Sequence, residues 1–496
     1  MSDPPDLDAA GLPEELSPLD QILHRGEANP RTRSGILTVE LLDTTPDWNT
    51  FRARFDTASR KVLRLRQKVV IPTLPTAAPR WVVDPDFNLD FHLRRVRVPE
   101  PGSFRQVMDL AEVAAQSPLD ISRPLWTATL IEGVHDGQAA LMVHLSHAVT
   151  DGVGGVEMFA NLYDLERQPP KQPVPPLPIP ADLSPNDLMR QGLNRLPSTI
   201  AGGLRDVLFG AAQAAGHVVR DPVSRLGSVI DYAMSGARVI GPVADPSPLL
   251  RRRSLSSRSD AIDIAFGDLH RAAKAAGGSI NDAYLAGLCG ALRLYHQAKG
   301  VPVDTLPMAV PVNLRSEADP AGGNRFAGVN LAAPIGLTDP AVRIRNIRTQ
   351  MTRKRDERAL DLVGAIAPVV SLLPDSVLES MAGSIVNSDV QASNVPVYAG
   401  DTFIAGAQVL RQYGLGPLPG VAMMVVLISR SGYCTVTARY DRAAITDPTL
   451  LAQCLLAGFD EVLALGGDGR AHPATFTAES PSPLSHTVST KGSAAQ

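Results

Sequence analysis

The sequence predicts an α/β protein with two related halves, each a mixed sheet flanked by helices. Three observations support this fold class. Segments of strand composition alternate with helical periodicity twice along the chain. A proline-rich stretch separates the two series. At 496 residues the chain is also too long for a single hydrophobic core, which favours two domains.

The first series of elements predicts an N-terminal domain over residues 15–167, after a polar tail at 1–14. Ser34–Asp43, Leu125–Val134 and Gly137–His147 are rich in β-forming residues and bounded by Gly, Pro or Asp. Apolar residues at helical spacing predict a helix over Ser103–Gln116.

Residues 168–250 are predicted to connect the two domains. The prolines of Gln168–Pro185 favour extended polyproline structure and oppose helix. Leu188–Ile240 is rich in Ala, Gly and Leu at helical spacing with scattered arginines. This segment, with Arg251–Arg253 after it, is interpreted either as an interfacial membrane helix or as a helical hairpin packed on the protein.

A second α/β domain is predicted over residues 251–469, followed by a polar tail at 470–496. The strand "AIDIAFG" starts the series, and "VAMMVVLISRSG" and "YCTVTARYD" continue it. A helix should open near Asn281, where Ser279 or Asn281 can cap free N–H groups, and should stop at Gly300. Leu285, Leu288 and Leu292 should form its buried face.

Composition excludes several functional classes. Hydrophobic residues at 44% and charged residues at 20% are typical of a globular protein. A formal charge of −4 argues against sequence-independent nucleic-acid binding. The 3 cysteines are scattered, so neither a disulfide framework nor a cysteine zinc site is predicted, and a reduced cytoplasmic setting fits. The N-terminus lacks signal-peptide features, and the longest apolar runs are about half of the ~18 residues that a membrane span needs.

The stretch "LMVHLSHAVTDGVGG" is the strongest candidate for an active site. A strand is predicted to run to about Ser146, to turn, and to lead into a helix near Gly152. A histidine at such a turn, His147, can act as a general base. The alternatives are a structural buried histidine and a metal site with Asp151, which lacks a third ligand nearby. The stretch lacks the GK[ST] of a phosphate-binding loop, and the chain has no G-x-S-x-G hydrolase motif.

The order of motifs along the chain resembles the bacterial wax ester synthase/acyl-CoA:diacylglycerol acyltransferase family, within the coenzyme A-dependent acyltransferase superfamily. "SHAVTDG" is similar to the HHxxxDG signature of that superfamily. "LSPLDQILHR", "SPLDISRPLW", "INDAYLAGLCGALRLY", "VPVNLRSEADPAGGNRFAGVN", "SNVPVYAGDTFIAGAQV" and "SRSGYCTVTARYDRAAITD" resemble further family blocks, in the expected order. The resemblance covers about Leu16 to Leu465.

This resemblance implies two chloramphenicol-acetyltransferase-like domains with an active-site tunnel between them. It implies transfer of a fatty acyl group from acyl-CoA to diacylglycerol or a long-chain alcohol, without a covalent acyl-enzyme. His147 aligns with the essential second histidine, which would deprotonate the acceptor hydroxyl. Acyl-CoA would be a co-substrate, with no bound cofactor and no metal. The lipid substrates imply a cytoplasmic protein that can associate peripherally with a membrane or lipid droplet; the sequence selects no oligomeric state.

The resemblance also assigns supporting residues. Asp151, with Gly152, resembles a structural element whose carboxylate pairs with Arg315. Asn281 is a candidate for orienting a substrate or for donating to the developing oxyanion, and plain helix capping is the alternative. The predicted tunnel residues are Ser146, Leu125, Trp126 and Asn394, and core packing is the alternative for Leu125 and Trp126. His144 receives no role.

One position departs from the family pattern: Ser146 stands where the family usually has the first histidine. This substitution keeps open a second hypothesis, a non-catalytic or weakly active lipid-binding paralogue. A third hypothesis is a condensation-type acyltransferase that takes its acyl group from a carrier protein.

Overall fold

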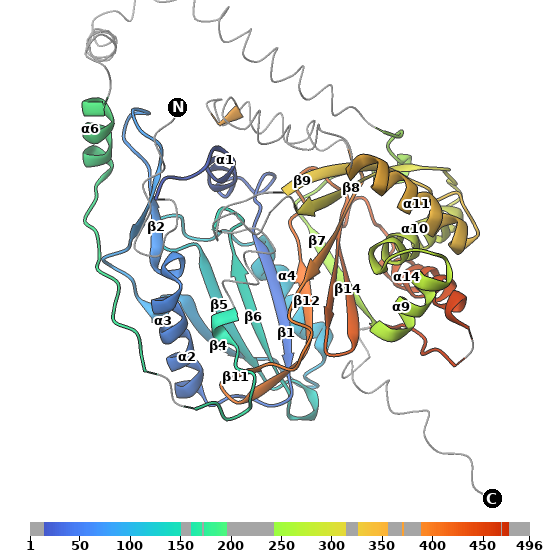
Figure 1. The fold of residues 1–496 in the computed structure, drawn as a ribbon, viewed down its shortest axis with the longest axis horizontal. Coiled ribbons are helices and arrows are strands. Elements are labelled where there is room, and N and C mark those ends of the chain that lie inside the picture. Colours follow the sequence, from blue (N-terminus) through green and yellow to red (C-terminus); the bar gives the residue numbers. More distant parts are fainter. Residues whose placement is uncertain are drawn as a thin grey trace, which may run out of the picture.

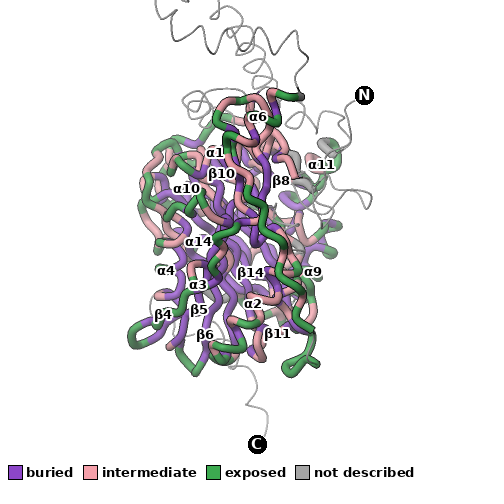
Figure 2. Tube along the Cα trace, turned by 90° about the vertical axis from the view of Figure 1, so that its left-hand side faces the viewer, coloured by how far each residue is buried: buried purple, intermediate pink, exposed green. Residues whose placement is uncertain are grey.

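Two large sheets lie side by side, with helices on their faces, in the computed structural model (Figure 1). The structure describes residues 14–149, 160–170, 173–195, 243–313, 326–355, 370–371, 388–467 and 469–475. Six strands form the first sheet and seven form the second. Most of the strands are buried, while exposed residues are concentrated on the outer helices, turns and loops (Figure 2). The predicted α/β fold with sheets flanked by helices is confirmed.

The first sheet has the strand order β11-β12-β1-β6-β5-β4. Only β4 and β5 pair in parallel within it, and its other neighbours are antiparallel. Its strands are β1 (Ile36–Leu42), β4 (Leu93–Arg97), β5 (Trp126–Glu132), β6 (Ala139–Leu145), β11 (Phe403–Ile404) and β12 (Ala407–Leu415).

Helices cover both faces of the first sheet. On one face Phe51 and Phe55 of α2 (Trp48–Lys61) pack into a core with strand residues such as Leu141. On the other face α4 (Phe104–Gln116) packs Phe104 and Val107 against β1. Ser103 and its partner Gln106 form a capping box, so α4 begins where its sequence predicts. The smaller elements are α1 (Pro18–Gly26), η1 (Leu63–Arg66), β2 (Gln67–Val70), β3 (Arg80–Val83), α3 (Leu89–His92), η2 (His135–Gly137) and η3 (Ala160–Leu162).

The second sheet has the order β15-β7-β14-β13-β10-β8-β9, and helices cover one of its faces (Figure 1). Its strands are β7 (Ser257–Ala265), β8 (Leu306–Asn313), β9 (Phe326–Ala333), β10 (Val390–Pro396), β13 (Met423–Arg430), β14 (Tyr433–Asp441) and β15 (Ala474–Thr475). The helices are η4 (Pro248–Leu250), α9 (Phe266–Ala275), α10 (Ile280–Ala298), α11 (Pro340–Arg355), α14 (Pro448–Leu463) and η6 (Ala464–Gly466).

The central helix of the second half is α10, and it packs tightly on α14. Leu285, Leu288 and Leu292 are all fully buried, as predicted. A Cβ at Gly458 of α14 would lie 2.2 Å from the backbone nitrogen of Ala291, so only glycine allows this approach. The segment Pro448–Gly466 is long and apolar enough to cross a membrane. Its apolar side forms part of the core with α10.

The predicted domain division does not account for two strands. Residues 403–415 lie within the range expected for the second domain, yet they form β11 and β12 of the first sheet. β12 pairs antiparallel with β1, Leu37 opposite Leu415. The segment after β10 therefore crosses from one sheet to the other. Likewise β15 pairs with β7, although 474–475 belong to the expected C-terminal tail. The residues 476–496 of that tail and 1–13 of the other lie outside the described part.

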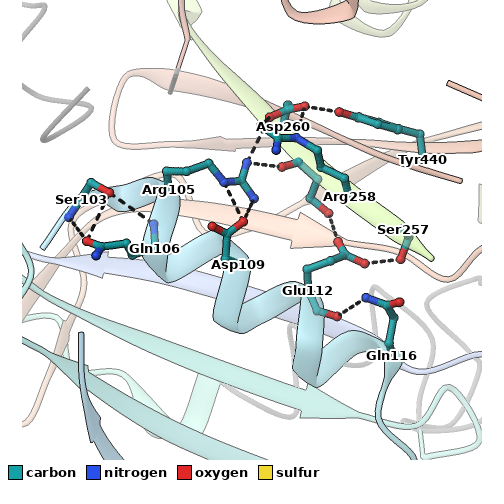
Figure 3. A network of polar contacts seen from close by, with 11 residues as sticks. Ser103, Arg105, Gln106, Asp109, Glu112, Gln116, Ser257, Arg258, Asp260 and Tyr440 are labelled. Carbon is teal, nitrogen blue, oxygen red and sulfur yellow. Dashed lines mark hydrogen bonds and ion pairs between the residues drawn. The ribbon is translucent and has the colours of Figure 1, made fainter. Parts of the chain in front are cut away.

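A buried polar network joins α4 to the second sheet (Figure 3). Arg105 Nη1 donates to the Ser259 carbonyl at 2.7 Å and to Asp260 Oδ1 at 3.0 Å. Glu112 accepts from Arg439 Nε at 3.0 Å and from the Ser259 hydroxyl at 2.5 Å. These four charged side chains are at most 6% exposed. Since buried charges are costly without partners, the network holds the two halves in one arrangement.

The proline-rich segment lies along the outer surface of the first half (Figures 1 and 2). Arg60 Nη1 donates to the Pro175 carbonyl at 3.1 Å, and the Ala181 N–H donates to Val83 at 3.3 Å. The segment leads into α6 (Pro185–Arg195), whose Leu188 is buried against the β2–β3 hairpin. The first residues of the expected Leu188–Ile240 helical region thus pack on the protein, and 196–242 lie outside the described residues.

Candidate active site

His147 lies in a tight turn directly after β6. The turn closes with a hydrogen bond of 3.1 Å from the Val149 N–H to the Ser146 carbonyl. Ser146, Ala148 and Val149 are at most 3% exposed, whereas His147 is half-buried. The fold therefore holds this histidine in a rigid, buried turn and leaves its side chain partly accessible.

Ser146 anchors that turn. Its N–H donates to the Leu125 carbonyl at 3.0 Å, which continues the β5–β6 pairing by one residue. Its hydroxyl donates to Glu27 Oε1 at 2.7 Å and accepts from the Ala148 N–H at 3.2 Å. A serine that bonds a backbone N–H two residues on stabilises a turn. Ser146 is completely buried, and its hydrogen bonds hold the turn that carries His147.

Glu27 is a site residue that the sequence did not reveal. It follows α1 and is 1% exposed, and it accepts from both the Ser146 and the Ser34 hydroxyls. Burial raises the pKa of its carboxyl, which the Ser146 hydrogen bond and Arg33 partly oppose. Nothing in the local sequence "HRGEANP" marks it. Only the pairing of β1 with β6 brings the residues before β1 beside Ser146.

The other histidine of the motif, His144, faces into the protein. It lies on β6 opposite Leu37 and is 4% exposed. Its Nε2 would be 2.7 Å from a Cβ at Gly35. Burial, with Arg439 and Arg33 nearby, lowers the pKa of His144 to about 4. A neutral, enclosed imidazole is suited to packing, consistent with the absence of an assigned catalytic role.

We expect His144→Asn to flatten the pH dependence of stability between pH 6.5 and 4. Because the pKa of His144 lies below its ordinary value of 6.5, the unfolded chain binds the proton first as the pH falls. The contribution of the neutral ring to the free energy of unfolding is complete above pH 6.5 and is lost as the pH falls toward 4. The free energy of unfolding should fall by about 3 kcal/mol over this range. Urea unfolding across this range should show a steeper fall for the wild type. The exposed His135→Asn is the control, and parallel curves for wild type and His144→Asn would contradict the expectation.

Asn281 lies at the start of α10, but it does not cap the helix. Ser279 is the N-cap, and its hydroxyl accepts from the Asp282 N–H in a capping box. Asn281 is inside the first turn with a half-buried side chain. Its amide therefore does not serve as the N-cap, and oxyanion binding stays a prediction.

The predicted tunnel residues occupy different environments. Leu125 and Trp126 are 1% exposed within the first core, and Trp126 Nε1 donates to the Leu65 carbonyl at 2.8 Å. Trp126 also stacks on His92 at 4.6 Å between ring centroids. These contacts favour core packing for both residues. Asn394 lies on β10 opposite Leu427 with an exposed side chain, so its tunnel role stays a prediction.

The supporting residues Asp151, Gly152 and Arg315 lie outside the described residues. Their predicted ion pair is therefore still an expectation. Within the described part of the chain, no group of three His, Cys, Asp or Glu side chains is arranged to hold a metal ion. The described site offers a half-buried imidazole in a turn whose other residues are buried.

Comparison with known families and structures agrees with this arrangement of two α/β halves. The chain matches the wax ester synthase/diacylglycerol acyltransferase catalytic domain over residues 8–284 and the WS/DGAT C-terminal domain over residues 322–462. It belongs to the wax ester synthase/diacylglycerol acyltransferase family.

Individual relatives support the assignment. A Mycobacterium tuberculosis H37Rv protein, provisionally named a diacylglycerol O-acyltransferase, is 67% identical over 480 residues, covering 96% of this chain and 98% of its own. The fold is similar to the wax ester synthase/diacylglycerol acyltransferase of Marinobacter aquaeolei VT8, with a TM-score of 0.61 and 19% identity, over 91% of this chain and 100% of that one. The first condensation domain of the CDA synthetase has the same fold, with a TM-score of 0.54 and 13% identity, over 94% and 99% of the two chains.

Proposed function

We propose that the protein transfers a fatty acyl group from acyl-CoA to the free hydroxyl of diacylglycerol, with a long-chain alcohol as an alternative acceptor. Family membership and the 67% identical relative support this reaction class. The structural observation that carries it is His147, half-exposed in a turn whose other residues are buried.

His147 acts as the general base in this reaction. One imidazole nitrogen removes the proton from the acceptor hydroxyl, and the oxygen attacks the thioester carbonyl carbon. The tetrahedral intermediate collapses, the carbon–sulfur bond breaks, and the imidazolium returns the proton to the coenzyme A thiolate. No acyl-enzyme forms. The amide of Asn281 is proposed to donate to the developing oxyanion, and Asp151 and Arg315 are proposed to support the turn as an ion pair.

Since the acceptor is a lipid, we also propose that the protein works at the surface of a membrane or lipid droplet on the cytoplasmic side. Arg251 and Arg252 are exposed at the end of the connecting region, where they can approach anionic headgroups.

Purified full-length protein with labelled palmitoyl-CoA tests the reaction. We expect labelled triacylglycerol with dioleoylglycerol, labelled wax ester with hexadecanol, and only background hydrolysis without an acceptor. Binding of palmitoyl-CoA without any product would overturn the proposal in favour of a lipid-binding paralogue. Product formed only from an acyl group on a carrier protein would favour the condensation-type alternative.

Ser146→Ala is expected to lower kcat about tenfold, because it removes one hydrogen bond to Glu27 and one from the Ala148 N–H. Steady-state kinetics with palmitoyl-CoA and dioleoylglycerol measures this. Glu27→Gln keeps an oxygen that accepts from Ser146 and should retain nearly full activity.

Ser146→His places an imidazole ring at a position where Ser146 is completely buried. We expect this substitution to lower the free energy of unfolding by about 1–3 kcal/mol. A fully active and stable Ser146→His protein would contradict this support role.

A further inference from the structure

A pocket of about 350 Å³ lies between the two halves. The first half contributes the connection from α1 to β1 and the end of α4. The second half contributes residues 251–257 before β7, the loop after β12 and the end of β14. The pocket therefore depends on the assembled protein rather than on either half.

Positive charge dominates this pocket. Among the described residues that line it, five are arginines and one, Asp441, is acidic; the arginines are Arg31, Arg33, Arg251, Arg253 and Arg439. The chain as a whole has a net charge of −4, so general basicity does not explain the cluster. A cleft lined by one sign of charge concentrates ions of the opposite sign.

Backbone groups hold two of these arginines in place without neutralising them. Arg33 donates from Nη1 to the Gln116 carbonyl at 2.7 Å and from Nε to the Glu27 carbonyl at 3.2 Å. Arg253 Nε donates to the Gly420 carbonyl at 3.2 Å. A carbonyl fixes a guanidinium but leaves its net charge available, which favours binding of an anion with several acceptor oxygens.

The acidic groups nearby are already engaged. Asp441 accepts from the Ser254 hydroxyl at 2.7 Å and from the Ala443 N–H at 2.8 Å. Glu112, behind the pocket, pairs with Arg439. Arg31 and Arg251 are exposed at the rim. Outside the lining, Asp389 acts electrostatically on Arg253, and Glu27 acts on Arg33. Within the lining itself, five arginines face a single carboxylate.

We propose that this pocket binds a phosphate group. The matching chemistry has two sources: the phosphorylated nucleotide end of coenzyme A and the headgroup of an anionic phospholipid. The first source rests on the proposed acyl-CoA reaction, and the second rests on the proposed work at a membrane surface. A Cβ at Gly35 of the pocket would lie 2.7 Å from His144 Nε2. The neighbouring Ser34 donates to Glu27, which accepts from Ser146. A phosphate bound here therefore lies close to the turn that carries His147.

Charge reversal at the rim tests the proposal in full-length protein. Arg31→Glu and Arg251→Glu are compared with Arg97→Glu, an exposed arginine on β4 outside the lining. Calorimetric titration with adenosine 3′,5′-bisphosphate and with coenzyme A tests the nucleotide source. Flotation with phosphatidylglycerol and phosphatidylcholine vesicles tests the lipid source.

We expect each rim variant to bind either the nucleotide probes or the phosphatidylglycerol vesicles at least about tenfold more weakly than the wild type. Added salt should weaken the same binding in the wild type. Weaker nucleotide binding with unchanged flotation identifies coenzyme A; the reverse identifies the lipid. Rim variants that match Arg97→Glu in both assays, or a wild type that binds neither probe, would overturn the proposal. Wild-type phosphate binding without acyl transfer would support the pocket and count only against the proposed function.

Discussion

Replacing His147 with alanine is expected to lower kcat by about 10²–10⁴-fold, because general-base catalysis contributes on that order. The side chain is half-buried, and its neighbours Ser146 and Ala148 carry the hydrogen bonds of the turn. The substitution should therefore remove the base without unfolding the site. Initial rates with labelled palmitoyl-CoA and dioleoylglycerol, measured with the thermal midpoint, check both parts of this expectation.

The matched control is His135→Ala, at an exposed histidine in the turn between β5 and β6, at the opposite end of β6. It should keep the wild-type rate. Turnover that persists unchanged in His147→Ala would exclude the proposed mechanism, provided that the variant is folded.

Glu112→Ala is expected to lower the free energy of unfolding by about 3–5 kcal/mol, the usual cost of removing one partner from a buried ion pair. It leaves Arg439, 5% exposed, without its carboxylate, and it removes the acceptor of the Ser257 and Ser259 hydroxyls. Figure 3 shows the bond between Glu112 of α4 and Ser257 of β7. Arg439 connects the same carboxylate to β14. Urea unfolding followed by circular dichroism measures the change.

Asp109→Ala is the control on the same helix. Its carboxylate pairs with Arg105 but is 63% exposed, and Arg105 keeps Asp260 as a buried partner. Exposed pairs contribute about 0–1 kcal/mol, so this variant should unfold nearly as the wild type does. Equal losses in the two variants would show that burial does not decide the strength of this network.

Local elements could be predicted from the sequence because their signals are local. The segments Ser34–Asp43 and Gly137–His147 contain β1 and β6, each shorter by a few residues at the ends. Gly300 stops α10 with a positive φ of 71°, which its lack of a side chain permits. The sequence allowed either Ser279 or Asn281 as the N-cap of α10. In the structure the N-cap is Ser279, because its hydroxyl accepts from the Asp282 N–H while the Asp282 carboxylate accepts from the Ser279 N–H.

Features that depend on distant pairing could not be predicted. The sequence of Ala407–Leu415 does not indicate which of the two sheets this strand joins. The strand is mostly buried, and either sheet would bury its apolar residues. Glu27 reaches Ser146 across 119 residues of sequence, and its role depends on that contact. The proline-rich segment was correctly expected to be extended, but its course along Arg60 and Val83 follows from surface contacts that composition does not encode.

The place of β12 has a consequence for the order of events during synthesis. β1 pairs with β6 on one side and with β12 on the other, and β12 ends at Leu415. A nascent chain that has emerged only as far as the connecting region carries β1 as an open edge, which is a template for aberrant strand pairing. The first sheet can be completed only when most of the chain has left the ribosome. Emergence of β12, rather than emergence of the first half, therefore sets the earliest moment at which the first sheet can be completed.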